Sequence, residues 1–116
     1  MNRENKKTMI ELFASKSNYG IIRELKRTSR ALQFKDFKLL INPKSNRKYS
    51  TKTIAFCLNE LKKNGIVKNE IVETGRRSHL GYCITPKGYF ACQILEEAEK
   101  NYQKLGKEKL IQIKNN

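Results

Sequence analysis

The sequence has few of the side chains from which catalytic centres are built. It contains one histidine, His79, and 11 acidic residues in 116. It has no glycine-rich phosphate loop, no carboxylates paired at a working spacing and no nucleophile next to a base. A lone histidine cannot assemble a catalytic relay, so we interpret His79 as an exposed turn residue. We therefore predict no catalytic residues and no enzymatic activity.

Cysteine is also scarce. Cys57, Cys83 and Cys92 form no Cys-x-x-Cys pair and have no histidine or acidic partners beside them. A zinc site needs about four ligands at close spacing, so we predict no metal and no cofactor. We interpret the three cysteines as small buried fillers in a reduced, intracellular protein. The alternative is a redox switch at Cys57, whose oxidation would disturb its helix.

Long apolar runs are missing. No run approaches the ~20 residues of a membrane span, and the N-terminus leads into an amphipathic pattern rather than a signal peptide. We expect a soluble, cytoplasmic chain without a membrane partner. The length suits one domain, residues 1–116.

Positive charge is what the sequence has in excess. The 25 lysines and arginines against 11 acidic residues give a net charge of +14. Residues 16–52 alone contribute +9 of it. An excess of this size destabilises a compact chain by self-repulsion and indicates an anionic partner. The alternative is a lysine-rich composition typical of a biased genome or a thermophile.

Apolar spacing, caps and turn residues predict five helices and two strands. The helices are expected at residues 4–15, 17–28, 33–41, 51–64 and 86–112, and the strands at residues 66–73 and 80–85. Ser17 or Asn18 is the expected cap of the second helix. Pro43 ends the third, and a polar, basic connection follows it at residues 42–49. Gly106 is expected to interrupt or end the last helix.

The helix at residues 51–64 has a cap at each end. Ser50 can accept a backbone N–H at its start, and Gly65 suits the left-handed position after its end. Ile54, Leu58 and Leu61 make its apolar stripe. The residues off the stripe are small, polar or cationic, which suits the major groove of a nucleic-acid duplex.

A predicted hairpin follows this helix, with residues 74–79 as its loop. Gly75 serves the turn, but folding has no need for Arg76 and Arg77 beside it. The two arginines suit phosphates or the narrow minor groove, and the alternative is a tip that only aids solubility.

The last helix carries two apolar stripes. Ala91, Leu95, Ala98, Tyr102 and Leu105 are spaced 4, 3, 4, 3 and form a heptad seam. Phe90 and Ile94 make a second stripe that is expected to face the domain's own core. The seam predicts dimerisation through Leu95, Ala98, Tyr102 and Leu105.

The element order predicts an α+β, mostly α fold: a winged helix-turn-helix with a two-stranded β-wing and a long C-terminal helix. A two-stranded ribbon cannot stand alone, so it must pack on the helices. Residues 17–90 form the expected core, and the helices at 4–15 and 86–112 are expected to make the dimer.

Three segments resemble winged-helix transcription regulators of the MarR-like, PadR-like and HxlR-like groups. The first is Tyr-Gly-Ile-Ile-Arg-Glu-Leu-Lys-Arg at residues 19–27, similar to the first helix of the DNA-binding unit. Residues 50–68 are similar to the recognition helix, which typically ends in Leu-x-x-Leu-x-x-x-Gly-Leu-Val. Tyr-Cys-Ile-Thr-Pro-Lys-Gly at residues 82–88 resembles the motif that closes the wing.

The resemblance implies a DNA-binding surface. Its expected residues are Ser50, Thr51, Lys52, Thr53, Phe56, Asn59, Arg76, Arg77, Lys44, Arg47 and Lys48. Lys52 and Thr53 rank above Asn59, which lies two turns into the helix. The alternative is a solvated helix face with Phe56 turned into the core. The connection at residues 42–49 is longer than in the family, and Phe56 stands where the family usually has a polar or basic side chain.

The predicted function is a homodimeric, sequence-specific regulator of transcription that binds double-stranded DNA. One alternative is a non-specific architectural or chromatin-type DNA binder. A second is a winged helix used for protein–protein contact, and RNA binding is a third. The sequence marks no pocket for a small-molecule effector.

Overall fold

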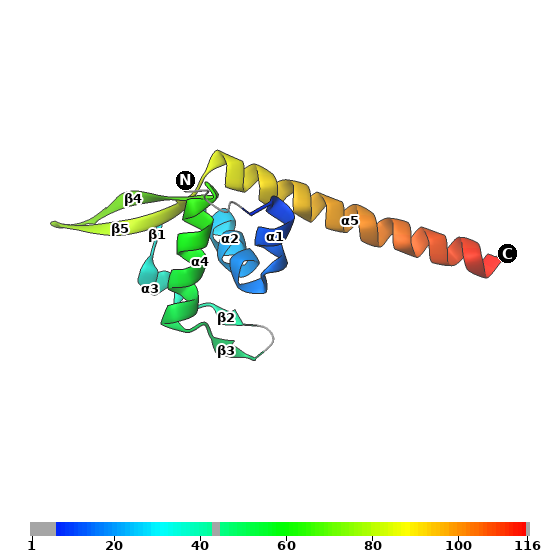
Figure 1. Ribbon diagram of the computed structural model, residues 1–116, viewed down its shortest axis with the longest axis horizontal. Coiled ribbons are helices and arrows are strands. Elements are labelled where there is room, and N and C mark those ends of the chain that lie inside the picture. Colours follow the sequence, from blue (N-terminus) through cyan, green and yellow to red (C-terminus); the bar gives the residue numbers. More distant parts are fainter. Residues whose placement is uncertain (1–6, 43–44, 116) are drawn as a thin grey trace, which may run out of the picture.

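In the computed structural model, the described residues, 7–42 and 45–115, form ten helices and strands (Figure 1). Side chains are described as far as residue 106. In chain order the elements are α1 (Met9–Ala14), α2 (Lys16–Thr28), β1 (Leu32–Gln33), α3 (Phe34–Phe37), β2 (Ile41–Asn42), β3 (Arg47–Lys48), α4 (Thr51–Lys63), β4 (Val67–Thr74), β5 (Arg77–Ile84) and α5 (Pro86–Asn115).

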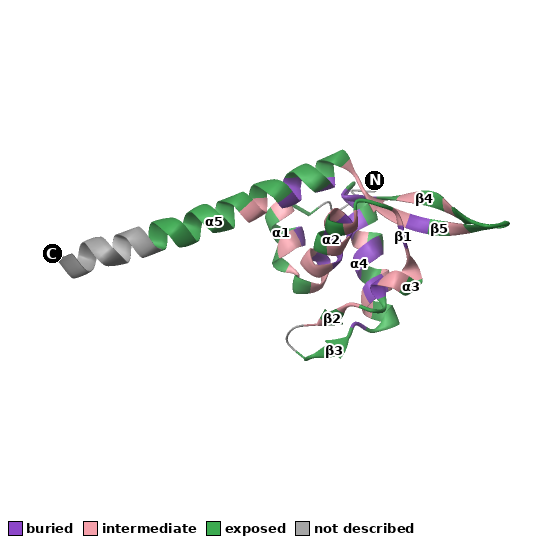
Figure 2. Ribbon diagram, turned by 180° about the vertical axis from the view of Figure 1, so that it is seen from behind, coloured by how far each residue is buried: buried purple, intermediate pink, exposed green. Residues whose placement is uncertain are grey.

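The core lies where α2 packs against α4. Each helix turns its apolar stripe inward, so that both stripes are fully buried (Figure 2). The buried stripes are Ile21, Ile22 and Leu25 of α2, and Ile54, Leu58 and Leu61 of α4. Leu12 of α1 and Phe37 of α3 belong to the same cluster. Burial of each such side chain contributes about 1.5–3 kcal/mol to folding.

The caps of α4 are as predicted, but the start of α2 is not. Ser50 is the N-cap of α4, and Gly65 adopts the left-handed region at φ 75°. The cap of α2 is Ser15 rather than Ser17 or Asn18. Asn18 is instead buried, and its Nδ2 donates to the carbonyl oxygen of Leu12 at 3.0 Å. A polar residue near the start of a helix can serve as a cap or, within the first turn, as a buried donor, and the sequence pattern did not distinguish the two roles.

The predicted third helix is shorter than expected and is flanked by two short strands. Only Phe34–Phe37 is helical, and the Asp36 carboxylate accepts from the backbone N–H of Gln33 at 2.8 Å. Before it, β1 pairs with β5; after it, β2 turns back and pairs with β3. The prediction of one helix over residues 33–41 is therefore wrong, because both flanks find backbone partners outside the segment.

The wing belongs to a three-stranded sheet in the order β1-β5-β4, not a two-stranded one. β4 and β5 pair from Val67 with Ile84 out to Thr74 with Arg77, so the loop is Gly75 and Arg76 alone. The predicted loop at residues 74–79 is too long. Residues 74–79 are polar because the tip of the hairpin extends beyond the core. A polar segment of this kind is typical of a loop, so the sequence predicted a loop where the strands continue.

The long helix α5 runs through Gly106 without a break. The predicted interruption is wrong, since one glycine in an exposed helix costs only about 1 kcal/mol. Phe90 and Ile94 are 62% and 41% exposed, so they do not face the core as predicted. Gly88, Ala91 and Cys92 are the buried residues in the part of this helix whose side chains are described. Over the described residues, no helix is both long enough and apolar enough to span a membrane.

The joint between β5 and α5 explains the Thr-Pro-Lys-Gly motif. The Thr85 hydroxyl donates to the Gly65 carbonyl at 2.6 Å and accepts from the backbone N–H of Gly88 at 3.0 Å. A Cβ on Gly88 would lie 2.4 Å from the carbonyl oxygen of Ile66. The motif therefore fixes α5 on the end of α4 through backbone contacts that only glycine permits.

Candidate nucleic-acid interface

The outer face of α4 presents the predicted groove-binding side chains. Thr51, Lys52 and Asn59 are exposed, and Thr53 is half-buried. Phe56 is 66% exposed, so the alternative that placed it in the core is wrong. An exposed phenyl group on a helix otherwise lined with polar side chains suits apolar contact, for example with a thymine methyl group.

The first turn of α4 is held in place by Ser50. The Ser50 hydroxyl accepts from the backbone N–H of Thr53 at 3.1 Å and donates to the Thr53 hydroxyl at 2.9 Å. Lys52 has no ion-pair partner among the residues that the structure describes. The turn therefore offers a free ammonium group beside hydroxyl groups whose positions are fixed.

The β4–β5 hairpin carries both predicted arginines at its tip. Arg76 lies in the turn and Arg77 begins β5, and both are exposed. Gly75 takes φ 63° as the first residue of the turn. His79 is not the exposed turn residue that we expected: it is half-buried within β5, opposite Val72.

The connection at residues 42–49 contains a second hairpin, β2–β3. Ile41 pairs with Lys48 and Asn42 with Arg47, and both basic side chains are exposed. Lys44, also predicted to bind DNA, lies outside the described residues. The sequence missed this hairpin because strands of two residues leave no readable alternation.

The cysteines do not form a reactive group. Cys57 and Cys92 are 3% and 0% exposed, as expected of buried fillers, whereas Cys83 is half-buried. Burial raises the pKa of the Cys57 thiol to about 11, and burial does the same for Cys92. The thiolate form that oxidants attack is thus disfavoured, which argues against a redox switch at Cys57. In the described ranges, no group of three or more His, Cys, Asp or Glu side chains could hold a metal ion.

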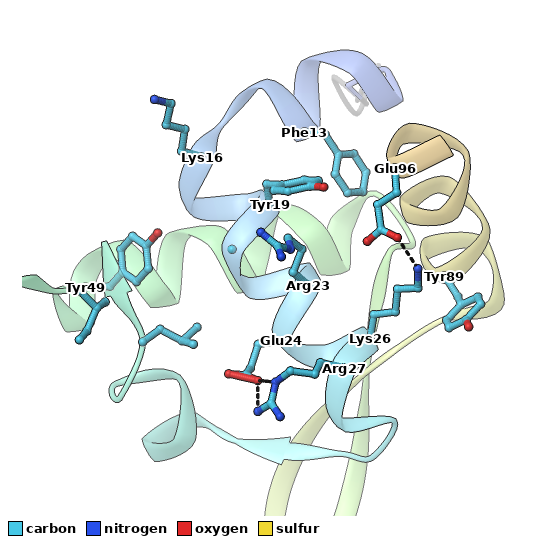
Figure 3. A pocket seen from close by; sticks show the side chains of 13 residues that line it. Phe13, Lys16, Tyr19, Arg23, Glu24, Lys26, Arg27, Tyr49, Tyr89 and Glu96 are labelled. Carbon is cyan, nitrogen blue, oxygen red and sulfur yellow. Dashed lines mark hydrogen bonds and ion pairs between the residues drawn. The ribbon is translucent and has the colours of Figure 1, made fainter. Parts of the chain in front are cut away.

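Sequence reasoning missed a cavity of about 800 Å³ between α2, the β2–β3 hairpin and the start of α5 (Figure 3). Aromatic and charged side chains line it. The Arg23 guanidinium lies 5.6 Å from the centre of the Tyr19 ring, and Lys26 forms an ion pair with Glu96 at 2.7 Å. The lining residues come from segments far apart in the chain, so no local sequence pattern predicts this cavity.

The predicted dimerisation residues lie along α5. Ala98, Tyr102 and Leu105 are exposed, and Leu95 is half-buried. Tyr102 and Leu105 are 74% and 56% exposed. Beyond its contact with α2, α5 extends away from the body of the molecule (Figures 1 and 2).

A helical unit with a recognition-type helix followed by a β-hairpin is a winged helix-turn-helix, which confirms the predicted fold class. Solved structures of transcription regulators share it. A MarR-family transcriptional regulator from Enterococcus faecalis V583 is 16% identical, with 94% of this chain and 97% of that chain covered and a TM-score of 0.67. A PadR-like transcription factor from Bacteroides fragilis is 19% identical, covering 84% and 93%, with a TM-score of 0.64.

The reduced form of the transcriptional regulator YodB from B. subtilis is also similar. It is 22% identical, covering 86% of this chain and 90% of that chain, with a TM-score of 0.63. No protein-family model and no curated protein matches the sequence. The suspected likeness to winged-helix regulators is therefore confirmed at the level of the fold.

Proposed function

We propose that this protein is a non-enzymatic, sequence-specific regulator of transcription that binds double-stranded DNA as a homodimer. The observation that carries the proposal is the outer face of α4. Its capped first turn exposes Thr51 and Lys52, and the chain leads from its far end into an arginine-tipped wing. The solved regulators of the same fold support this assignment.

In this proposal α4 enters the major groove. Lys52 and Thr53 read base edges from the first turn, with Thr51 and the capping Ser50 next to the backbone. Phe56 contacts a thymine methyl group, and Asn59 is placed to bond adenine if the helix lies deep in the groove. Arg76 and Arg77 of the wing bind phosphates or the adjacent minor groove.

The dimer is proposed to form through α5, with help from α1. The seam residues Leu95, Ala98, Tyr102 and Leu105 lie on one face at heptad spacing. An isologous contact of this kind gives two recognition helices related by a two-fold axis. Their half-sites would lie about one helical turn, ~34 Å, apart.

The net charge of +14 also fits a second candidate, an architectural DNA binder without sequence preference. Selection of bound duplexes from a random pool at controlled salt separates the two. Recovery of an inverted repeat supports the regulator, whereas a featureless pool supports the architectural binder. Negligible binding at physiological salt would favour a protein-interaction module instead.

A further inference from the structure

We propose that the β2–β3 hairpin is a second wing, which binds the DNA backbone between the two half-sites. The inference rests on the proposed function, because it needs a dimer on an inverted repeat. It concerns the segment between α3 and α4, in which β2 pairs with β3. Its chemistry comes from Arg47 and Lys48.

The two hairpins leave opposite sides of α4. In Figures 1 and 2 the β4–β5 wing projects to one side of the molecule, whereas β2–β3 projects to the side along which α5 extends. Since α5 carries the proposed dimer seam, the two-fold axis lies on that side as well. The β2–β3 hairpin thus points toward the centre of the binding site and the β4–β5 wing points outward.

The centre of such a site offers a suitable partner. When two major grooves one turn apart face a protein, the minor groove between them faces it too. The two phosphate backbones form the walls of that groove, about 6 Å apart. Neighbouring residues of a strand point to opposite faces, so Arg47 and Lys48 can reach a phosphate on either wall.

Local charge favours this contact. Residues 37–59 contain no Asp or Glu, and Arg47 and Lys48 are exposed without an ion-pair partner among the described residues. Charges this close to the capped end of α4 add to the attraction for the same duplex. A hairpin of two-residue strands has no folding requirement for two adjacent cations.

The base of the hairpin, where β3 leads into α4, is held in place by Tyr49. Tyr49 joins β3 to the Ser50 cap and is 8% exposed. Its backbone N–H donates to the carbonyl oxygen of Leu40 at 3.3 Å. Its hydroxyl oxygen packs over α2, 3.2 Å from where a Cβ on Gly20 would stand. The base of the hairpin next to α4 is thus placed during folding, so DNA binding does not bear the entropy cost of positioning it.

Hydroxyl-radical footprinting on the selected inverted repeat tests the inference with three full-length proteins: wild type, R47A/K48A and K100A/K104A. The last removes the same charge from exposed positions on the face of α5 opposite the seam. We expect R47A/K48A to lose protection of the central backbone and to keep that of both half-sites. Its log–log salt slope should fall by about 1.8, at about 0.9 for each lost phosphate contact.

Three outcomes would overturn the second wing. The first is that R47A/K48A leaves both the protection of the central backbone and the salt slope unchanged. The second is that R47A/K48A loses protection at the outer flanks instead of the centre. The third is that K100A/K104A loses as much central protection as R47A/K48A. Circular dichroism and sedimentation of each variant verify that fold and assembly are retained. If no inverted repeat is recovered at all, the proposed function has failed, and the second wing with it. A bound inverted repeat with an unchanged centre rejects the second wing alone.

Discussion

The Nζ atom of Lys26 lies 2.7 Å from Oε2 of Glu96 and so connects α2, in the helix-turn-helix unit, to α5. The Cys92 thiol donates to the other carboxylate oxygen at 3.4 Å, and the Lys26 ammonium also lies 5.2 Å from the centre of the Tyr89 ring. The hydrogen bond from Lys26 lowers the pKa of Glu96, and the same bond raises the pKa of Lys26. The pair therefore links α5 to α2, in addition to the joint at Thr85 and Gly88.

The first prediction concerns this pair and pH. Because the pKa of Glu96 is lower in the folded state, its contribution is complete above the ordinary value of 4.5 and disappears as the pH falls through the folded pKa. Glu96→Gln should lower the urea midpoint at about pH 7, and this effect should shrink as the pH falls below 4.5 and through the folded pKa. A difference between wild type and variant that stays constant across this range would show that the ion pair is not its cause.

The second prediction concerns the joint at Gly88. Gly88→Ala should destabilise the fold by at least about 1–3 kcal/mol, since the new Cβ would stand 2.4 Å from the Ile66 carbonyl oxygen. Gly106→Ala is the matched control: its Cβ meets nothing within 4 Å, and alanine favours helix by about 1 kcal/mol. Urea unfolding should show that the free energy of unfolding is lower than that of wild type for Gly88→Ala and higher for Gly106→Ala. Equal stabilities would mean that the joint can shift without cost.

The third prediction concerns the β4–β5 wing. Arg76→Ala with Arg77→Ala should weaken binding to all duplexes by similar factors and lower the salt slope by about 0.9 for each lost phosphate contact. If the arginines enter the minor groove, the loss should be larger when the flanks are A·T-rich. Affinity measured by fluorescence anisotropy at several salt concentrations distinguishes these modes. Unchanged affinity on both kinds of flank would exclude the wing from DNA binding.

The fourth prediction concerns assembly. Leu95→Glu with Tyr102→Glu places charges in the α5 seam and should yield monomers that bind DNA weakly, because one half-site provides too little affinity alone. Sedimentation equilibrium at roughly 10–50 µM protein is the measurement, a range that detects even weak dimers. Wild-type protein that sediments as a monomer there would reject the dimer.

The sequence predicted the elements whose stability is local. The helix between Ser50 and Gly65 has its caps and apolar stripe within one segment, so its bounds were foreseen almost to the residue. The third strand was missed because Leu32 pairs with Tyr82, 50 positions away. Non-local pairing of a two-residue strand leaves no periodic signal.

Which side of α5 is buried also depends on contacts with residues far away in the chain. Phe90 and Ile94 are apolar and correctly spaced for a core stripe, yet Ala91 and Cys92 occupy the contact with the body. The Thr85–Gly88 joint fixes the rotation of this helix, and that rotation depends on the backbone position of Ile66. Hydrophobicity alone could not predict which stripe would be covered. The sequence predicted Arg47 and Lys48 as DNA-binding residues from their charge. It did not predict the β2–β3 hairpin that positions them.

The most direct test of the central claim, sequence reading by α4, is the ratio of specific to non-specific affinity in wild type and in K52A/T53A. The double variant keeps the Ser50 cap bond to the backbone N–H of residue 53 and the buried stripe, so folding should be preserved. Binding to the selected site should weaken by about 1–3 kcal/mol for each good base contact. Binding to random duplex should weaken only by the share of one lysine charge, so the ratio should fall. A ratio near one in wild type, or a ratio unchanged by the double substitution, would contradict the account.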